Sequence, residues 1–171
     1  MNDNTKVIFK AVKVGYEKFG GLHETFISKG DVRFDSIDVA NKYNGDAINV
    51  GGAMDMTSGI FTVPFSGLYF FTFSGLAFQK LSSKTLDIFI LVKKNGNRIY
   101  EILDTQSFGE VTRKVLSSSW MSKLEKGDKI QLSVWYGSLA ANKNEHIIFT
   151  GQLIMKGIFL KYYLVSNLLN K

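Results

Sequence analysis

The chain has 171 residues, of which 21 are lysine or arginine and 15 are aspartate or glutamate, so its formal net charge is +6 at pH 7. It contains no cysteine, which excludes disulfide scaffolds, thiolate nucleophiles and cysteine-ligated zinc or iron–sulfur centres. Hydrophobic residues make up 45% and aromatic residues 13% of the chain, which is typical of a single globular domain with an aromatic, strand-rich core.

The first predicted strand is Lys6–Val14, in which apolar residues are interleaved with lysines. The stretch that follows, from Gly15 to Ile48, is rich in glycine and charged residues. We expect a long irregular connection there, with one short strand at Val32–Phe34.

The segment Gly59–Phe78 is dense in β-branched and aromatic residues and is interrupted by glycine. This composition predicts two strands that meet at a turn around Pro64–Gly67. The second strand carries Tyr69, Phe71 and Phe73 on one face and further aromatic residues on the other. We therefore expect this strand to lie inside a sandwich and not at its edge.

A β-hairpin is predicted next. Thr85–Lys93 alternates between apolar and polar residues, and Asn95 and Gly96 separate it from the strand-like run Arg98–Leu103. Both turn residues tolerate the positive φ of a type I′ turn, so this pair is the clearest hairpin signal in the chain.

Three further strands complete the pattern. The first is Val111–Leu124, and the last is His146–Ile154. Between them, Lys129–Tyr136 alternates strictly, so we expect Tyr136 on the buried face of its strand and Trp135 on the opposite face.

Strands at this spacing, separated by glycine and asparagine turns, predict an all-β fold, an antiparallel jelly-roll sandwich of about ten strands. We assign residues 1–154 to this one domain. Residues 155–171 form an apolar C-terminal extension, which we expect to pack on its own domain or on a neighbouring subunit. No apolar run reaches the roughly 18 residues of a membrane-spanning helix.

Residue patterns that support catalysis are scarce. The only histidines are His23 and His146. Glu145 and His146 have the chemistry of a general-base pair, but a solvent-exposed histidine at a strand end explains them as well. His23 has no identifiable carboxylate partners for a metal site, and the chain has no nucleophile elbow or phosphate-binding glycine loop. The sequence thus predicts a protein that is not an enzyme, with no cofactor.

The positive charge bears on the choice of partner. A net charge of +6 spread over the whole chain is modest, and lysines on exposed strands commonly serve solubility and edge protection. The charge pattern therefore disfavours nucleic acid as the partner.

Ten residues stand in an ordered series of glycine-X-phenylalanine, proline, glycine-X-tyrosine, glycine-aspartate and phenylalanine-X-glycine elements. They are Gly59, Phe61, Pro64, Gly67, Tyr69, Phe71, Gly127, Asp128, Phe149 and Gly151. This series resembles the complement C1q globular-head domain of the C1q and tumour-necrosis-factor-like superfamily, especially its arthropod-type members. The resemblance runs from about Val7 to Ile154. Physically, the glycines and the proline suit turns and the aromatic residues suit a core, so the series also has a purely structural explanation.

The resemblance implies a homotrimer that is formed through one sheet of each protomer. By strand position, Phe9, Trp120 and Ile148 are the candidate interface residues. Their alternative role is in the core of a single chain.

The resemblance also implies a non-catalytic recognition module, of the kind used in pattern recognition and innate immunity. Its trimer would bind a protein or glycan ligand through surface loops, with affinity raised by multivalency. The alternative is a structural or adhesive subunit in which the tail from Gly157 joins neighbouring trimers. Some relatives bind calcium, but no acidic cluster in this sequence has ligand spacing, so no metal ligand is assigned.

The family points to an extracellular, secreted protein. The segment Met1–Lys13 lacks the continuous apolar stretch of a signal peptide. If Met1 is the native start, the sequence instead predicts a cytoplasmic protein.

Overall fold

The computed structural model describes residues 6–14, 17–18, 21–22, 25–42, 45–78, 85–107, 113–141 and 146–157. Within these ranges the chain forms thirteen strands and one short helix, α1 (Ile37–Lys42). The strands are β1 (Ile8–Lys13), β2 (Glu17–Lys18), β3 (Gly21–Leu22), β4 (Thr25–Asp31), β5 (Ile48–Val50), β6 (Met54–Asp55), β7 (Ile60–Thr62), β8 (Gly67–Phe78), β9 (Thr85–Lys94), β10 (Asn97–Ser107), β11 (Arg113–Leu124), β12 (Lys129–Ala141) and β13 (Ile147–Lys156).

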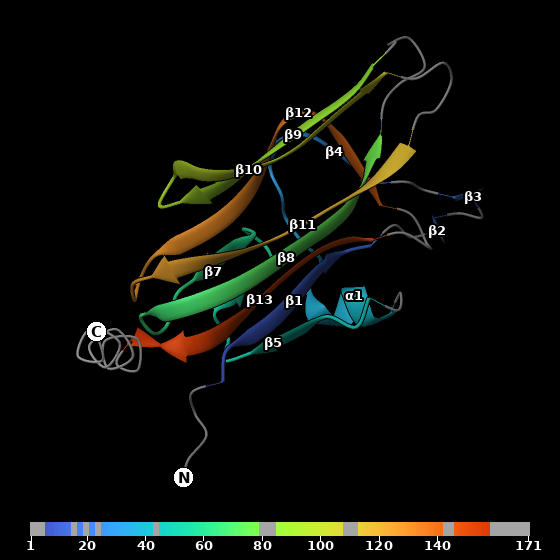
Figure 1. Ribbon diagram of the computed structural model, residues 1–171. Coiled ribbons are helices and arrows are strands. Elements are labelled where there is room, and N and C mark those ends of the chain that lie inside the picture. The colour runs from blue at the N-terminus through green and yellow to red at the C-terminus, as the bar shows by residue number, and fades with distance from the viewer. Residues whose placement is uncertain are drawn as a thin grey trace.

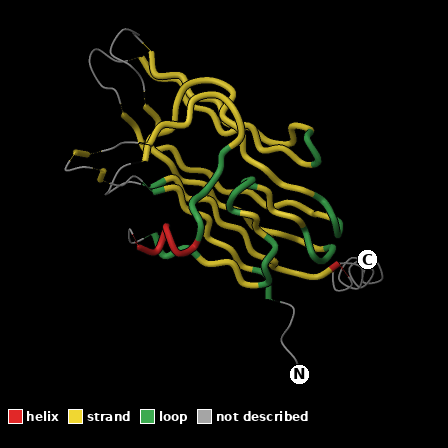
Figure 2. Tube along the Cα trace, turned by 180° about the vertical axis from the view of Figure 1, so that it is seen from behind, coloured by secondary structure: helices red, strands yellow, loops and turns green. Residues whose placement is uncertain are grey.

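Eleven of these strands form one connected sheet that folds over into two layers (Figure 1). We call the layer with strand order β5-β1-β13-β8-β11 sheet I, and the layer built on β10-β9-β12, with β4 and β7 beside β12, sheet II. The layers are continuous where Ser138–Ala140 of β12 pairs with Leu76–Phe78 of β8. Figure 2 shows the long strands from behind, with α1 at one margin of the sandwich. The predicted all-β antiparallel sandwich is confirmed.

The core between the layers is aromatic. Phe61, Tyr69, Phe71 and Phe149 are fully buried, and Phe9 is 1% exposed. The centroid of the Phe9 ring lies 4.9 Å from that of Phe61 and 5.1 Å from that of Phe149. Burying one such side chain contributes about 1.5–3 kcal/mol. This cluster therefore supplies a large share of the energy that holds the two sheets together.

Strand β8 lies inside sheet I, between β13 and β11, as the sequence predicts. Its residues Tyr69, Phe71 and Phe73 are buried in the core, and the turn at 63–66 separates it from β7. The strand continues through Gly75 without interruption. A Cβ atom at Gly75 would lie 3.0 Å from Cζ of Phe73, so glycine there makes room for an aromatic ring.

The predicted hairpin is also confirmed. Strands β9 and β10 pair antiparallel, and Asn95 and Gly96 between them have φ values of 52° and 82°. Two consecutive positive φ values are what a type I′ turn requires, and this turn matches the twist of the flanking strands.

The predicted faces of β12 are correct up to Val134 and wrong at Tyr136. Pairing with β9 shifts between Val134 and Tyr136, so Trp135 is an extra residue in a β-bulge. Strand alternation ends at a bulge because two residues then oppose one on the neighbouring strand. Tyr136 is consequently exposed, and so is Trp135 beside it.

The connection from Gly15 to Ile48 contains more regular structure than expected. It includes β4, which pairs with β12, and the helix α1. The predicted strand Val32–Phe34 is wrong, because these residues follow β4 outside any ladder. The side chains of Val32 and Phe34 are nevertheless buried, and their backbone N–H groups donate to Leu132 O and Met56 O respectively, each at 2.9 Å.

The last strand runs slightly beyond its predicted end. Strand β13 ends at Lys156, whereas the predicted strand ends at Ile154. Most of the C-terminal extension, residues 158–171, lies outside the described residues.

Candidate functional site

The outward face of sheet I carries a row of residues that runs across all five strands. The pairing registers join Val50 to Ile8, Ile8 to Gln152, Gln152 to Phe70 and Phe70 to Met121. Four of the five side chains are apolar, and Met121 is 64% exposed. We call this set the outward row.

The neighbouring row on the same face is mostly polar. It joins Ile48, Lys10, Thr150, Thr72 and Ser119 in register. The hydroxyl groups of Thr72 and Thr150 form a hydrogen bond of 2.7 Å. The outward face of sheet I therefore combines an apolar strip with a strip of hydroxyl groups that are already partly satisfied.

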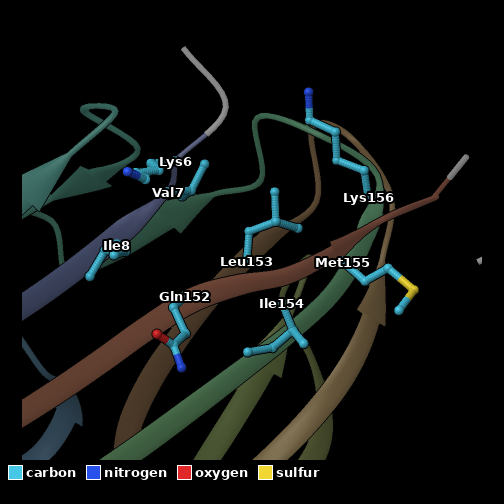
Figure 3. A pocket seen from close by; sticks show the side chains of 8 residues that line it. All are labelled: Lys6, Val7, Ile8, Gln152, Leu153, Ile154, Met155 and Lys156. Atoms are coloured by element: carbon cyan, nitrogen blue, oxygen red, sulfur yellow. The ribbon is translucent and has the colours of Figure 1, made fainter. Parts of the chain in front are cut away.

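A hollow of about 520 Å³ lies beside Ile8 and Gln152 of the outward row, where Lys6–Ile8 run beside Gln152–Lys156 (Figure 3). Figure 3 shows Val7 and Leu153 on the core side of β1 and β13, and Gln152 on the opposite side. Pairing with β8 shifts between Leu153 and Met155, so Ile154 sits at a bulge with its side chain exposed. The exposed apolar surface therefore extends along β13 from the outward row to Ile154.

One side of the sandwich is open between β10 and β11. In the described ranges, β10 pairs with β9 and β11 pairs with β8, so each long strand leaves one edge without a ladder. Tyr100 of β10 stacks on Trp120 of β11 with ring centroids 5.6 Å apart, and its hydroxyl lies 3.3 Å from that of Ser118. Exposed strand edges are templates for association with another chain. We call this side, with Ile99, Tyr100 and Ser118, the open edge.

The three candidate interface residues lie mainly inside the single chain. Phe9 is 1% exposed, and its ring is enclosed by Phe61 and Phe149. Trp120 is 9% exposed and stacks on Phe71, with centroids 5.5 Å apart. Ile148 is half-buried against a small cluster that contains Val12 and Ala40. For Phe9 the geometry favours the core role.

Sequence reasoning missed the outward row. Its members occupy alternate positions of their strands, opposite to the core residues, so the period-two pattern contained part of the signal. Their assembly into one strip depends on the register between strands, which the pattern of one strand does not contain.

Three positions of the ten-residue series that resembles the C1q domain must be glycine, because a larger side chain would clash with neighbouring atoms. A Cβ atom at Gly59, which has φ +73°, would lie 1.9 Å from Val32 O. At Gly67 it would lie 2.2 Å from Met155 O, and at Gly151 it would lie 2.3 Å from Cε1 of Phe9. Real Cβ atoms do not approach other atoms so closely, so these positions serve the packing of the sandwich.

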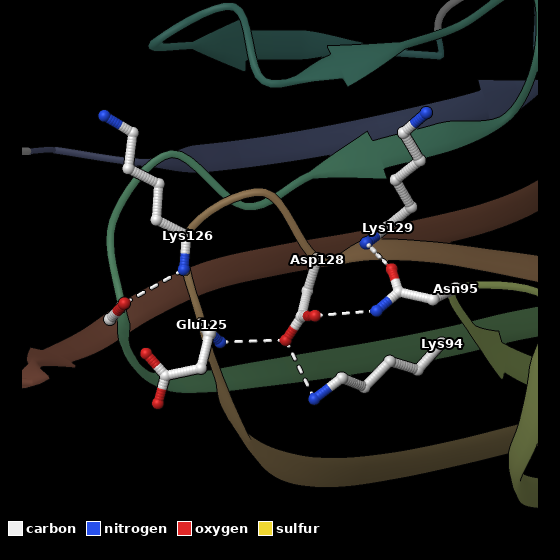
Figure 4. A network of polar contacts seen from close by, with 7 residues as sticks. Lys94, Asn95, Glu125, Lys126, Asp128 and Lys129 are labelled. Carbon is white, nitrogen blue, oxygen red and sulfur yellow. Dashed lines mark hydrogen bonds and ion pairs between the residues drawn. The ribbon is translucent and has the colours of Figure 1, made fainter.

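Gly127 and Asp128 belong to a polar network that joins three turns at one end of the sandwich (Figure 4). Oδ2 of Asp128 accepts from the backbone N–H of Glu125 and from Nζ of Lys94, both at 2.8 Å. Its Oδ1 accepts from Nδ2 of Asn95 at 2.8 Å. The backbone N–H of Gly127 donates to Val63 O, which connects the turn before β8.

The charge of Asp128 is stabilised by this network. Burial of the Asp128 carboxyl raises its pKa, but the hydrogen bonds from Lys94, Glu125 and Asn95, with the positive charge of Lys94, outweigh burial and hold the pKa below its usual value. Glu125 and Asn95 lie in turns and Lys94 is the last residue of β9, and the arrangement resembles no acid–base pair. Its role is to fix the turns.

No group of three or more histidine, aspartate or glutamate side chains lies together in the described ranges. His146 is half-buried just before β13, and His23 and Glu145 lie outside the described residues. Among the residues that the structure describes, no helix is both long and apolar enough to span a membrane.

Comparison with known proteins finds relatives that are similar to this chain in sequence. Complement C1q tumor necrosis factor-related protein 3 from Mus musculus and that from Homo sapiens are each 28% identical to this chain over 108 residues. The matched region is 63% of this chain and 42% of each relative, so the chain spans less than half the length of these proteins. Both are vertebrate proteins, and the arthropod-type assignment stays a prediction.

Two solved structures share the fold. The globular domain of zebrafish Complement 1qA protein superimposes with a TM-score of 0.59 at 17% identity, covering 89% of this chain and 100% of that chain. Murine APRIL at pH 5.0 superimposes with a TM-score of 0.56 at 12% identity, covering 87% of this chain and 100% of that one. The predicted jelly roll is therefore confirmed.

The family model for the C1q domain matches residues 27–154, which is well over half of the chain. This match runs from within β4 to within β13, and therefore includes strands of both sheets but not β1. The chain belongs to the C1q domain family.

Proposed function

We propose that this chain is a non-catalytic recognition module that works as a homotrimer. Membership of the C1q domain family is consistent with a non-enzymatic recognition or assembly role. The observation that carries the trimer is the outward row, an apolar strip on a sheet face that one chain leaves exposed. A sheet face that meets water normally carries polar residues, and an exposed apolar strip marks an interaction surface.

The open edge supplies the complementary surface. The outward row of one copy packs against the open edge of the next copy, with Ile99 and Tyr100 at the contact. Contact between two different surfaces is heterologous, and it closes into a ring when the rotation between copies is suitable. A threefold rotation gives the trimer that the family resemblance implies. In this assembly Trp120 supports Tyr100 from behind and Phe9 supports the outward face from the core. Ile148 lies on the outward face of sheet I, half-buried against Val12.

Three copies display three equal sets of surface loops. A weak site in each copy then gives strong overall binding to a ligand that repeats in space. We propose an extracellular setting and a protein or glycan ligand.

The trimer is tested by sedimentation equilibrium of the wild type at micromolar concentration, together with Met121→Lys and Ile8→Lys. Both side chains are exposed in the single chain, so a lysine there is tolerated by the fold and is costly only in an interface. We expect a trimeric wild type and monomeric variants. Leu103→Lys, an exposed apolar residue of sheet II, is the matched control and stays trimeric. A monomeric wild type, or trimers in both variants, contradicts the proposal.

The alternative function is that of a structural or adhesive subunit, in which the C-terminal extension, residues 155–171, joins neighbouring trimers. Residues 158–171 include two tyrosines and several leucines, a composition suited to contacts between assemblies. Deletion of these residues is expected to leave a soluble trimer. Loss of a higher assembly on deletion, with the trimer intact, favours the structural role.

A further inference from the structure

The outward face of sheet II carries a second exposed apolar cluster, separate from the outward row. It contains Trp135 and Tyr136 of β12, Phe89 and Leu91 of β9, and Leu103 of β10. Trp135 and Tyr136 are 59% and 57% exposed, and Leu103 is also exposed. We call these five residues the aromatic platform.

The backbone holds the platform in place. The β-bulge puts Trp135 and Tyr136 side by side at the surface, and Tyr136 and Leu103 both face Phe89 across the strands. The rings of Tyr136 and Phe89 meet edge to face with centroids 6.1 Å apart. Gly137, with φ +78°, follows the bulge, and a Cβ atom there would lie 2.4 Å from Asp87 O. The bulge is thus a built feature that aims two aromatic rings at solvent.

The surroundings of the platform are polar and contain two ion pairs. On one side Lys93 pairs with Asp31 at 3.3 Å, and on another Arg98 pairs with Glu101 at 2.5 Å. The hydroxyl groups of Ser28 and Ser138 lie together beside the bulge. Each pair holds charges of opposite sign, so neither pair favours an anionic or a cationic ligand. The rim offers hydroxyl and charged hydrogen-bonding groups to a neutral, polar ligand.

The size of the platform argues for a small occupant. An aromatic side chain buries about 150–250 Å² when fully covered, so three partly exposed aromatic side chains with two leucines beside them offer roughly 400 Å². One partner of a standard protein–protein interface buries about 800 Å². The platform therefore fits one or two rings of a small ligand better than a folded protein partner.

We propose that the aromatic platform binds neutral oligosaccharides. A pyranose ring has a flat apolar face of C–H groups that stacks on an aromatic ring, and a perimeter of hydroxyls that can bond to the polar rim. Trp135 and Tyr136 are the stacking residues, and the Ser28–Ser138 pair supplies hydroxyl contacts. This inference rests on the proposed recognition function and names its ligand class and its site.

The two tryptophans make the test direct. Trp135 is exposed and Trp120 is 9% exposed, so ligand stacking changes the emission of Trp135 and protects it from acrylamide quenching. The probes are cellohexaose, chitohexaose and laminarihexaose, titrated up to about 10 mM to cover weak single-site affinities. We expect saturable binding of at least one probe.

Substitutions in the platform then test whether it is the binding site. Trp135→Ala and Tyr136→Ala are each expected to weaken binding by about tenfold or more, measured by calorimetry so that the readout survives loss of the tryptophan. Val39→Ala, at an exposed apolar residue of α1 that belongs neither to the platform nor to the open edge, is the control and retains affinity. Circular dichroism verifies that each variant is folded.

The outcomes of these experiments distinguish failure of the saccharide proposal from failure of the trimer proposal. The platform lies within one chain, so monomeric Met121→Lys retains the affinity of each site. Absence of saturable binding to all three probes, or equal affinity in Trp135→Ala, overturns the inference even when the wild type is trimeric. Capture of a protein by the platform, with no binding of the saccharides, also overturns it.

Discussion

Gly151 and Phe9 are paired across β13 and β1, and the phenylalanine ring occupies the space where a side chain of residue 151 would lie. A Cβ atom at Gly151 would be 2.3 Å from Cε1 of Phe9 and 2.8 Å from Cδ1 of Phe71. The close contact lets the aromatic core approach the backbone of β13. It also explains why one small residue interrupts a strand of larger ones.

Gly151→Ala is therefore expected to lower the free energy of unfolding by about 1–3 kcal/mol, because the added methyl group displaces buried rings. Urea denaturation followed by fluorescence measures this change. In a double-mutant cycle, Phe9→Leu relieves part of the clash, so the two substitutions together cost less than the sum of the single costs. Additive costs would show that the contact with Phe9 is not the cause.

Trp120 gives a prediction about ring stacking and polarity. Within the part of the chain that the structure describes, its indole N–H has no hydrogen-bond acceptor, and its ring stacks between Tyr100 and Phe71. Trp120→Phe keeps an aromatic ring and removes the unsatisfied donor, so we expect it to cost under about 1.5 kcal/mol. Trp120→Ala is expected to cost about 3–5 kcal/mol. Equal costs of the two substitutions in thermal or chemical unfolding would contradict this explanation.

Asp128 makes stability depend on pH. Its pKa in the folded chain is lowered, against the opposing effect of burial, by Lys94, Glu125 and Asn95. The carboxylate therefore contributes stability that is fully present above the unfolded value of about 3.9 and is lost as pH falls through the lower folded value. We expect Asp128→Asn to be less stable than the wild type at pH 7, with a smaller loss of stability on acidification below about pH 5. Parallel stability–pH curves from urea unfolding would contradict the prediction.

Asp55 tests the same principle in a different turn. The Ser58 hydroxyl, which donates to Asp55 Oδ2 at 2.7 Å, lowers the pKa of Asp55 most, and the backbone N–H groups of Ser58 and Thr57 lower it further. We expect Ser58→Ala to raise the pKa of Asp55 toward its ordinary value without reaching it. An NMR titration of the carboxyl carbon measures this shift. Ser117→Ala, an exposed serine of β11 that has no contact with this turn, is the control and leaves the pKa unchanged.

Much of the sandwich was predictable because the relevant signals are local. Alternation with a period of two identified β8, β9 and β13, since it reflects which face of one strand meets the core. The hairpin at Asn95 and Gly96 was predictable because only a few residue types adopt two consecutive positive φ values without cost. The segment containing β4 has a positive φ at Lys29 and at Gly30 and no clean alternation, so its pairing with β12 could not be predicted from local pattern.

The sequence by itself determined the fold class, the aromatic core and the absence of cysteine chemistry, because these follow from composition and from short-range periodicity. The tertiary structure alone decided which exposed residues stand together. Val50 and Met121 lie on one strip because four strand registers align them. Tyr136 lies at the surface because the extra residue Trp135 shifts the pairing of β12 with β9. Register and bulges depend on contacts between distant segments, so no single strand contains that information.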